Sequence, residues 1–343
     1  MNALKRLLAG HKGRAFVVTD SNVERLVLDG LKSDLKGIDA FPRFVIEPGE
    51  QNKSVVTVQH VWEWLFSHDA SRSDIVLNIG GGMVTDIGGF AAATFKRGLP
   101  YANLATTLLG AADASVGGKT GVNFMGGKNI VGAFAMPVMT AVCHTSFSTL
   151  PRAELLSGYG EILKMTLVDD PRLLPRLLDI DELLSDTVRL GALAEEAAVM
   201  KMKIVNRDPH EKGLRKVLNF GHTFGHAFES IMTVRGLSLP HGVAVAHGIV
   251  VGLILSRMLL DAESEWLYRI ATNIVSPWMQ APRLTCDDYP SLLDTMRADK
   301  KNTGDGSFRF VLLRRPGFPV PDVAVGESDL LPALDIYRDL ISG

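Results

Sequence analysis

An apolar segment that runs directly into three consecutive glycines constrains the fold of this chain most strongly. Residues 75–79 have the composition of a buried strand, Gly80, Gly81 and Gly82 follow at once, and Asp86 comes four residues later. Glycines in this place let backbone N–H groups approach a phosphate closely while the next helix points its N-terminus at it. The order is not G-x-G-x-x-G. From the pattern alone we therefore predict a nucleotide site, and the alternative is a tight turn packed under a helix.

Two lysines in glycine-rich settings favour anion binding over that alternative. Lysines flanked by glycine are most often solvated loop residues. Here, however, Lys119 and Lys128 stand among side chains able to hydrogen-bond a polar ligand, namely Asp113, Ser115, Thr120 and Asn129.

Composition limits the class of protein. With 343 residues, 46% apolar and 22% charged, the chain is long enough for two globular domains, each with its own core. A formal net charge of -2 gives no reason to expect a nucleic-acid partner or a membrane surface. The two cysteines, Cys143 and Cys286, cannot make a disulfide framework and suit a reducing compartment. We therefore expect a cytoplasmic protein.

Neither of the two stretches that could meet a membrane has the required pattern. Residues 1–14 are basic but contain no sustained apolar run, so we expect no signal peptide. The most apolar helical run, residues 242–260, is interrupted by His247, Ser256 and Arg257. It is typical of a buried core helix rather than a membrane span.

The first part of the chain alternates strand-like and helix-like segments. Residues 15–19, 44–46 and 75–79 predict short buried strands, and residues 55–67 predict an amphipathic helix. Such alternation predicts a parallel sheet covered by helices. Asp20 and Asn22 follow the first strand, at the sheet edge where such folds bind ligands.

The pattern changes near residue 150. Helical periodicity dominates from residue 152 to about 279, and the only later strand-like piece is 308–313. We predict an α/β domain over residues 1–150 with a Rossmann-like parallel sheet, and a mainly α-helical domain over 151–343.

Histidines in the second part indicate a metal site. His222 and His226 are four residues apart, on one face of a helix, while His241 and Glu161 offer further ligands. A catalytic divalent metal typically takes three protein ligands and keeps one position open. The glutamate that a metalloprotease places between its two histidines is absent. Spacing alone does not say which three residues bind metal, and histidines satisfied inside a helical core remain the alternative.

A set of motifs in a fixed order carries a specific resemblance. In chain order they are G-G-G-x-x-x-D, R-G-x-x-Y, T-T-L-L-x-x-x-D-x-S-V-G-G-K-T-G-x-N, G-K-N, S-G-x-x-E-x-x-K, L-N-F-G-H-T-F-G-H-A-x-E, H-G and D-K-K. Over nearly its whole length the chain resembles the 3-dehydroquinate synthase family of sugar-phosphate cyclases. The resemblance implies an active site in the cleft between an NAD-binding domain and a helical domain that binds a divalent metal, usually zinc, with cobalt as the alternative.

The resemblance also implies roles for individual residues. The metal ligands are Glu161, His222 and His241, so His226 is not a ligand but lies near the substrate phosphate. The positions that contact NAD are Asp20, Asn22, Glu50, Lys53, Gly81, Gly82, Met83, Asp86, Thr106, Thr107, Lys128 and Thr149. The positions that contact substrate are Asp113, Lys119, Lys128, Asn129, Lys164, Lys201, Arg215, Asn219, His226 and one or both of Lys300 and Lys301. Arg97 matches an arginine that reaches the neighbouring subunit's site, which implies a homodimer.

The implied substrate is 3-deoxy-arabino-heptulosonate 7-phosphate, a phosphorylated keto acid. The implied reaction oxidises it transiently with NAD, eliminates phosphate, reduces the product, opens the ring and closes a carbocycle by an aldol step. Arginine is the better bidentate partner for a carboxylate, so we expect Arg215 to bind that group, helped by Lys201. One departure stands out. After His241 the family usually has a glutamate two residues on, and Val243 occupies that place. If that glutamate supports the histidine, metal affinity is lower here.

Three other functions compete with this one. A sister cyclase would act on sedoheptulose 7-phosphate, which lacks the carboxylate, but Lys201, Arg215 and Asn219 together favour the keto acid. A metal-dependent polyol dehydrogenase would release NADH stoichiometrically, and it leaves G-G-K-T-G and G-K-N unexplained. A ligand sensor without activity would require loss of a metal ligand or of Asp86, and these residues are present.

Overall fold

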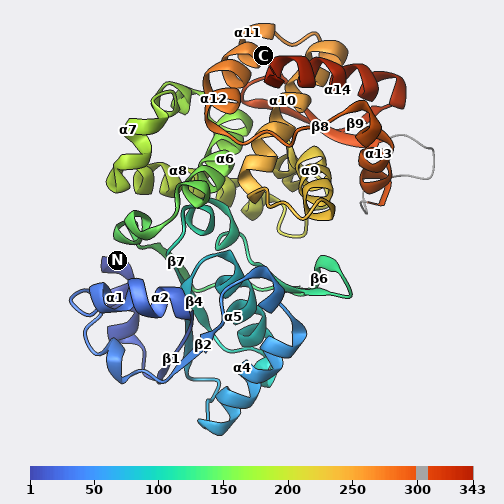
Figure 1. Cartoon of the computed structure of the whole chain (residues 1–343). Coiled ribbons are helices and arrows are strands. Elements are labelled where there is room, and N and C mark those ends of the chain that lie inside the picture. Colours follow the sequence, from blue (N-terminus) through green and yellow to red (C-terminus); the bar gives the residue numbers. More distant parts are fainter. Residues whose placement is uncertain (299–307, 343) are drawn as a thin grey trace. The chain divides into compact units, whose positions relative to one another are not determined.

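The computed structural model describes residues 1–298 and 308–342, and the chain divides into two compact units (Figure 1). One unit comprises Met1–Pro151 and Asp186–Ala198, and the other comprises Arg152–Ser185 and Val199–Gly343. Helix α8 (Thr187–Arg207) begins in the first unit and ends in the second. A single boundary at residue 150 does not describe this division. Lys300 and Lys301 lie outside the described residues.

A five-stranded parallel sheet forms the centre of the first unit. Its order is β2-β1-β3-β4-β7, and the strands are β1 (Ala15–Asp20), β2 (Arg43–Ile46), β3 (Ile75–Gly80), β4 (Tyr101–Ala105) and β7 (Met139–Val142). The three predicted strands are confirmed as β1, β2 and β3. Because β2 and β3 lie on opposite sides of β1, the strand order reverses there, and sheets of this kind bind ligands beside such a reversal.

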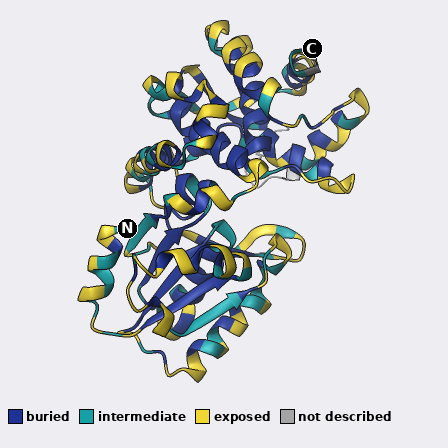
Figure 2. Ribbon diagram, turned by 60° about the vertical axis from the view of Figure 1, so that its left-hand side comes forward, coloured by how far each residue is buried: buried dark blue, intermediate teal, exposed yellow. Residues whose placement is uncertain are grey.

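Helices cover both faces of this sheet. Those of the first unit are α1 (Asn2–Gly10), α2 (Ser21–Leu26), α3 (Leu28–Leu31), α4 (Val55–Ser67) and α5 (Gly82–Thr94). The helix predicted over residues 55–67 is confirmed as α4. Phe16 and Val18 belong to the core that includes residues of α4 and α5, whereas Ala15 and Val17 belong to the core that includes residues of α1, α2 and α3. This alternation follows from the two-residue period of a strand, and Figure 2 shows the strands buried between partly exposed helices.

The glycine-rich segment after β4 forms a hairpin that the sequence did not predict. Strand β5 (Lys119–Phe124) pairs antiparallel with β6 (Gly127–Phe134). A side chain at Gly132 would collide with the carbonyl of Thr120, and a Cβ at Gly121 would lie 2.7 Å from the carbonyl oxygen of Val131. These glycines therefore allow the backbones of the two strands to approach closely. Lys119 opens β5 and Lys128 lies in β6.

The second unit is mainly helical, as predicted. Its helices are α6 (Arg152–Val168), α7 (Ile180–Ser185), the end of α8, α9 (His222–Val234), α10 (His241–Leu260), α11 (Ser264–Ile270), α12 (Ser276–Trp278), α13 (Tyr289–Ala298) and α14 (Glu327–Ser342). Helix α10 is long and apolar enough to cross a membrane by length and composition, but 78% of its most apolar window is buried inside the protein. His247 and Ser256, two of the polar residues that interrupt it, are fully buried. The expected core helix is confirmed.

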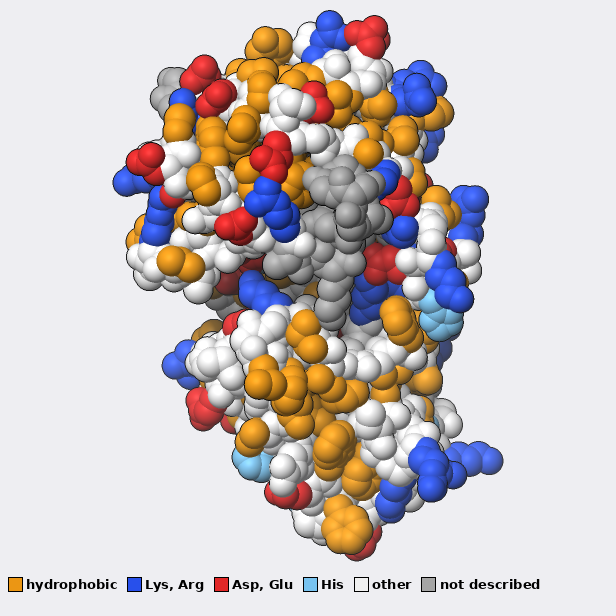
Figure 3. Space-filling view, turned by 90° about the vertical axis from the view of Figure 1, so that its right-hand side faces the viewer, with side chains coloured by type: hydrophobic (Ala, Val, Ile, Leu, Met, Phe, Trp, Pro, Cys, Tyr) orange, Lys and Arg blue, Asp and Glu red, His pale blue; other side chains and the backbone are white. Residues whose placement is uncertain are grey.

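A second late strand corrects the sequence analysis. Strand β8 (Phe308–Arg315) contains the predicted piece, and β9 (Phe318–Val325) pairs antiparallel with it. Pro319, Pro321 and Asp322 mask β9 in the sequence, because proline and aspartate are rare in strands. Proline is tolerated in edge strands, and among the described residues β9 pairs only with β8. On the face drawn in Figure 3, acidic and basic side chains are interspersed, in keeping with the small net charge.

Candidate active site

Close contacts at glycines bring three distant side chains together in the second unit. A side chain at Gly160 would collide with the carbonyl of Gly242, and one at Gly242 would collide with the carbonyl of Ser157. The Gly242 N–H also donates to Ser157 Oγ at 3.0 Å. Only glycine lets α6 and the first turn of α10 approach so closely. Glu161 and His241, the neighbours of these glycines in the chain, are thereby placed side by side.

Close contacts at glycines also hold the start of α9 against α10. A side chain at Gly248 would collide with the carbonyl of Gly221, and Gly221 has φ +78°, in the left-handed region that favours glycine. A Cβ at Gly225 would lie 3.1 Å from backbone atoms of Val245. His222, the first residue of α9, therefore lies near the N-terminus of α10.

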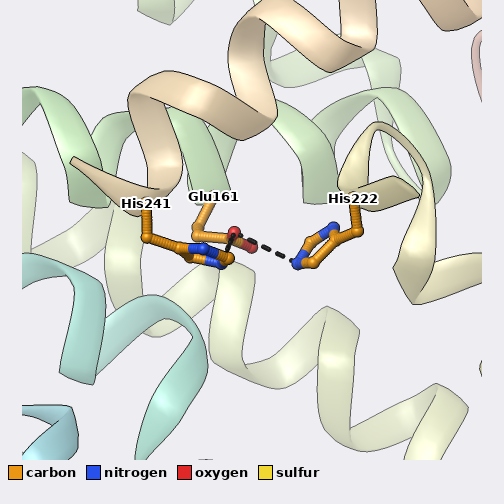
Figure 4. A group of neighbouring side chains, drawn as sticks. All are labelled: Glu161, His222 and His241. Atoms are coloured by element: carbon orange, nitrogen blue, oxygen red, sulfur yellow. Dashed lines mark ion pairs between the residues drawn. The ribbon is translucent and has the colours of Figure 1, made fainter. Parts of the chain in front are cut away.

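Glu161, His222 and His241 form a compact group of metal-binding atoms (Figure 4). Glu161 Oε1 lies 3.5 Å from His222 Nε2 and 3.4 Å from His241 Nε2. One ligand atom from each residue falls within 4.8 Å of the other two. Two imidazoles and one carboxylate are a donor set that catalytic zinc sites use. The residues present therefore fit a divalent metal.

Buried charge sets the electrostatics of this group. Glu161 is fully buried, and its Oε2 lies 2.5 Å from the Nζ of Lys164, one turn along α6. Burial and the nearby lysine lower the pKa of His222 well below its usual value. Burial also opposes protonation of His241, but the carboxylates of Glu161 and Glu229 outweigh it and raise the pKa of His241 to about 10. Protons and a metal therefore compete for the same nitrogen atoms.

His226 is less buried than the group around Glu161. Its ring centroid lies 5.5 Å from that of His222 and 5.7 Å from that of His241, and its side chain is exposed. Together with Glu229 and His241 it forms a second set of potential ligand atoms within 4.8 Å of one another. Geometry by itself thus offers two triads, which share His241.

Three of the residues proposed to bind the substrate's anionic groups, Lys201, Arg215 and Asn219, also belong to the second unit. Arg215 is 2% exposed and donates from Nη1 to the Pro209 carbonyl at 2.6 Å, while Lys201, on α8, is buried. Asn219 donates from Nδ2 to Glu211 Oε1 at 2.7 Å. Glu211 has φ +56°, a strained conformation for a side-chain-bearing residue. This carboxylate could not be predicted from the sequence, because it belongs to none of the motifs.

In the first unit, a second set of residues lies along one edge of the sheet. Asp20 is the last residue of β1, and Gly81 and Thr106 come directly after β3 and β4. The three residues therefore share the carboxyl edge of neighbouring parallel strands. Thr106 N donates to the Gly80 carbonyl at 3.0 Å. Asp20 caps α2 by accepting from the backbone N–H of Asn22 and Val23, and burial outweighs these bonds to raise its pKa.

Helix α5 begins at this edge. Its N-cap residue is Gly81, no side chain caps it, and Gly82 and Met83 form its first turn. An uncapped helix N-terminus is a favourable place for a phosphate. A Cβ at Gly81 would lie 2.8 Å from Thr107 Cγ2, so the turn also fits closely under its neighbours. The two interpretations of these glycines, a phosphate-binding turn and a tight turn packed under a helix, are therefore compatible.

The remaining predicted residues of the first unit surround α5 and the hairpin. Lys53, 6% exposed, pairs with Asp86 of α5 at 2.6 Å. Asn123 links two of the predicted segments, donating to Glu50 Oε1 at 2.8 Å and accepting from the Asn129 N–H at 2.9 Å. Asn123 is conspicuous in the sequence only as the last residue of one motif.

Four other predicted residues have simple placements in this unit. Asp113 lies in a single π-helical turn, Gly110–Ala114, a local irregularity that is frequent at functional sites. Lys128 and Thr149 are exposed. Arg97 is exposed and has φ +67°. The structure thus gathers Asp20, the glycine turn and the threonines in the first unit, and gathers the metal-binding group in the second.

Comparison with known proteins gives the family. A family model described as 3-dehydroquinate synthase N-terminal matches residues 43–157, and one described as 3-dehydroquinate synthase C-terminal matches residues 158–302. The chain is 39% identical to the 3-dehydroquinate synthase of Parabacteroides distasonis over 328 residues, covering 95% of this chain and 92% of the relative.

Solved structures support the same fold. The 2-epi-5-epi-valiolone synthase ValA of Streptomyces hygroscopicus subsp. jinggangensis, solved with NAD+ and Zn2+ bound, matches with a TM-score of 0.80 at 26% identity, over 97% of this chain and 93% of that one. A 2-deoxy-scyllo-inosose synthase, solved with carbaglucose-6-phosphate, NAD+ and Co2+, matches with a TM-score of 0.80 at 22% identity, over 99% and 95%. By its sequence match over both of its parts, the chain belongs to the 3-dehydroquinate synthase family.

Proposed function

We propose that this protein is a 3-dehydroquinate synthase, a phosphate-eliminating carbon–oxygen lyase of aromatic amino acid biosynthesis. It converts 3-deoxy-arabino-heptulosonate 7-phosphate to 3-dehydroquinate and phosphate with no net oxidation. The observation that carries the proposal is the joint presence, in a chain of this family, of the Glu161–His222–His241 group and the glycine turn before α5.

The cofactors are NAD and one divalent metal, zinc or cobalt. Relatives of the same fold were solved with NAD+ and with Zn2+ or Co2+. Glu161, His222 and His241 hold the metal, while the carboxyl edge of the sheet holds NAD. When bound, NAD supplies a hydride acceptor that returns the hydride later in the cycle, and the metal supplies Lewis acidity toward a substrate oxygen.

The chain's own charged residues suit a substrate that is anionic at both ends. Arg215 binds the carboxylate, because a guanidinium can donate two parallel hydrogen bonds to that group. Lys201 assists it. The phosphate is held by the cationic and amide side chains of Lys119, Asn129, Asn219 and His226.

Elimination needs little from the protein beyond this binding. After oxidation at C5, the neighbouring C6 proton is acidic. The C–O bond to phosphate breaks, and a phosphate oxygen takes the C6 proton, so no strong protein base is required. The later reduction, ring opening and aldol closure act on the same intermediate. Holding that intermediate in place through every step is positioning, which contributes about 7–11 kcal/mol in favourable cases.

We also propose a cytoplasmic homodimer in which Arg97 reaches the partner's active site. The side chain of Arg97 is exposed, and its backbone lies in the strained left-handed region. Exposed apolar side chains are frequent on the nearby hairpin and the segment after it, at Phe124, Met125, Ile130, Phe134, Met136 and Val138. Exposed apolar residues at this density are typical of interaction surfaces.

Phosphate release from two substrates tests the function. The purified protein, loaded with NAD and Zn2+ or Co2+, is given 3-deoxy-arabino-heptulosonate 7-phosphate or sedoheptulose 7-phosphate, with and without a chelator. We expect chelator-sensitive phosphate release from the keto acid alone. Release from sedoheptulose 7-phosphate alone would make the protein a sister cyclase and would overturn the role of Arg215.

A further inference from the structure

The ring of His241 lies between two carboxylates. Its Nε2 is 3.4 Å from Glu161 Oε1, and its Nδ1 is 3.3 Å from Glu229 Oε2. Glu229 is 9% exposed and belongs to α9, twelve residues before His241 in the chain. It was not among the residues predicted to bind metal, cofactor or substrate.

The other histidine of the group is arranged in the same way. His222 points its Nε2 at the same oxygen of Glu161, at 3.5 Å, and its Nδ1–H donates to the Phe220 carbonyl at 3.3 Å. In both rings, therefore, Nε2 points at Glu161 and Nδ1 points at an acceptor. An acceptor at Nδ1 fixes the proton there, which leaves the lone pair of Nε2 for a metal.

We propose that Glu229 is the positioning residue of His241. Its carboxylate accepts the Nδ1–H, holds the neutral ring in the tautomer that presents Nε2, and fixes the ring's direction toward Glu161. The inference rests on the proposed metal site and adds a residue to it.

The cost of burying a carboxylate supports a specific role. Phe224, Phe228 and Met232 on the same helix are almost fully buried, so α9 faces an apolar interior around Glu229. A buried carboxylate is expensive without a partner. An isosteric apolar residue would pack there without that cost. His241, the first residue of α10, is a hydrogen-bond partner of this carboxylate.

The same geometry bears on Val243. The resemblance led us to expect that this valine removes a carboxylate partner of His241. Val243 is 2% exposed and apolar. Glu229 supplies such a partner from α9 instead, so the ring of His241 is supported from a neighbouring helix. We therefore expect that the reduced metal affinity inferred from Val243 does not occur.

Metal affinity, measured apart from activity, tests the role. Metal-depleted full-length protein is titrated with Co2+ against a competing chelator, and the visible absorption of bound Co2+ reports its coordination. Loss of such a carboxylate partner typically weakens metal binding about 10- to 100-fold. Glu229→Gln should show that loss with the shape of the Co2+ spectrum retained, because the three ligands remain. Glu229→Asp should recover part of the affinity.

A matched control and a second variant make the result decisive. Glu195→Gln removes the carboxylate of another glutamate–histidine pair, His144 Nε2 with Glu195 Oε1 at 3.0 Å, and should leave Co2+ affinity unchanged. Far-ultraviolet circular dichroism checks that each variant is folded. If Glu161→Gln loses Co2+ but Glu229→Gln binds it like the parent protein, the positioning role is wrong and the metal site stands.

Two other results would also overturn the inference. If Glu229→Gln abolishes binding while Glu161→Gln retains it, Glu229 is itself a ligand, in the triad with His226 and His241. If neither variant changes Co2+ affinity, the proposed metal site itself fails, and with it the inference.

Discussion

The two units place their functional residues in different ways. In the first unit, Asp20, Gly81 and Thr106 each lie at the carboxyl end of a strand of one parallel sheet, and the fold itself puts them on one edge. In the second unit, Glu161 and His241 come from helices far apart in the chain and meet because glycines let those helices touch. The first arrangement rests on topology, and the second rests on packing.

Because of this difference, we expect the two sites to tolerate substitutions differently. A site at a sheet edge is built largely from backbone and loop side chains, so single substitutions there should reduce binding without disturbing the core. The group around Glu161 is buried and charged, and its geometry depends on the close backbone contact of α6 with α10 at Gly160 and Gly242. Substitutions there should affect metal binding and the stability of the unit together.

The largest effect is expected from Glu161→Gln. Removing a charged ligand should lower Co2+ affinity by about a thousandfold or more and abolish turnover, since a neutral amide is a poor metal ligand. NAD affinity, measured by calorimetry, should stay within about twofold of the parent value. His222→Gln should give the same pattern without removing a buried negative charge. Normal turnover in both variants would refute the metal assignment.

The packing of α6 on α10 is tested by Gly242→Ala. The added methyl would collide with the Ser157 carbonyl, and overpacking of this kind costs about 1–3 kcal/mol or more. We expect a lower melting temperature and weaker Co2+ binding in the same variant. Gly30→Ala is the control, because a Cβ there meets no atom within 4 Å. Unchanged stability and affinity in Gly242→Ala would show that the contact does not position His241.

At the sheet edge, Asp86→Asn should weaken NAD binding alone. It removes the partly exposed carboxylate that pairs with the buried Lys53, 2.6 Å away, and losses of charged hydrogen bonds cost about 1.5–3 kcal/mol, or roughly 10- to 100-fold in Kd. Calorimetry with NAD measures the change, and Co2+ titration should give the parent affinity. A matching loss of Co2+ affinity would contradict the independence of the two sites.

A smaller effect, confined to acidic pH, is expected in the core of the second unit. Burial lowers the pKa of His247 to about 4, and its neutral ring accepts from Tyr337 and donates to the Gln280 carbonyl. The unfolded chain takes up this proton near pH 6.5 and the folded one near pH 4, so stability falls as pH drops between them. From these values the loss between pH 7 and pH 5 is about 2 kcal/mol.

His247→Gln tests this pH dependence. The variant should be less stable at pH 7 but should lose less stability on acidification to pH 5. Urea unfolding at several pH values measures it. An identical pH dependence in parent and variant would rule out His247 as the group responsible.

Regular, apolar segments were the part of the fold that the sequence predicted well. Buried parallel strands are near-continuous apolar runs, which is why β1, β2 and β3 stand out. The hairpin of β5 and β6 did not, because its glycines hide the alternation of a strand. Strand β9 was missed because of its prolines.

The residues of the candidate site could likewise be predicted from the sequence only in part. Spacing alone pointed to His222 and His226 as readily as to His222 and His241, and only the family resemblance separated them. Glu229 and Asn123 each end one of the quoted motifs, but their partners His241 and Glu50 lie 12 and 73 residues away in the chain. Glu211, which accepts from Asn219, belongs to none of the motifs. Hydrogen bonds of this kind follow from tertiary packing, so a linear pattern cannot predict them.

The central claim is that NAD is used and restored within each catalytic cycle. The most direct measurement gives the metal-loaded enzyme less NAD than substrate, and follows phosphate release and NADH absorbance in the same tube with 3-deoxy-arabino-heptulosonate 7-phosphate. We expect many phosphates to be released for each NAD, with no NADH accumulating. One NADH formed for each substrate consumed, or no phosphate at all, would contradict it.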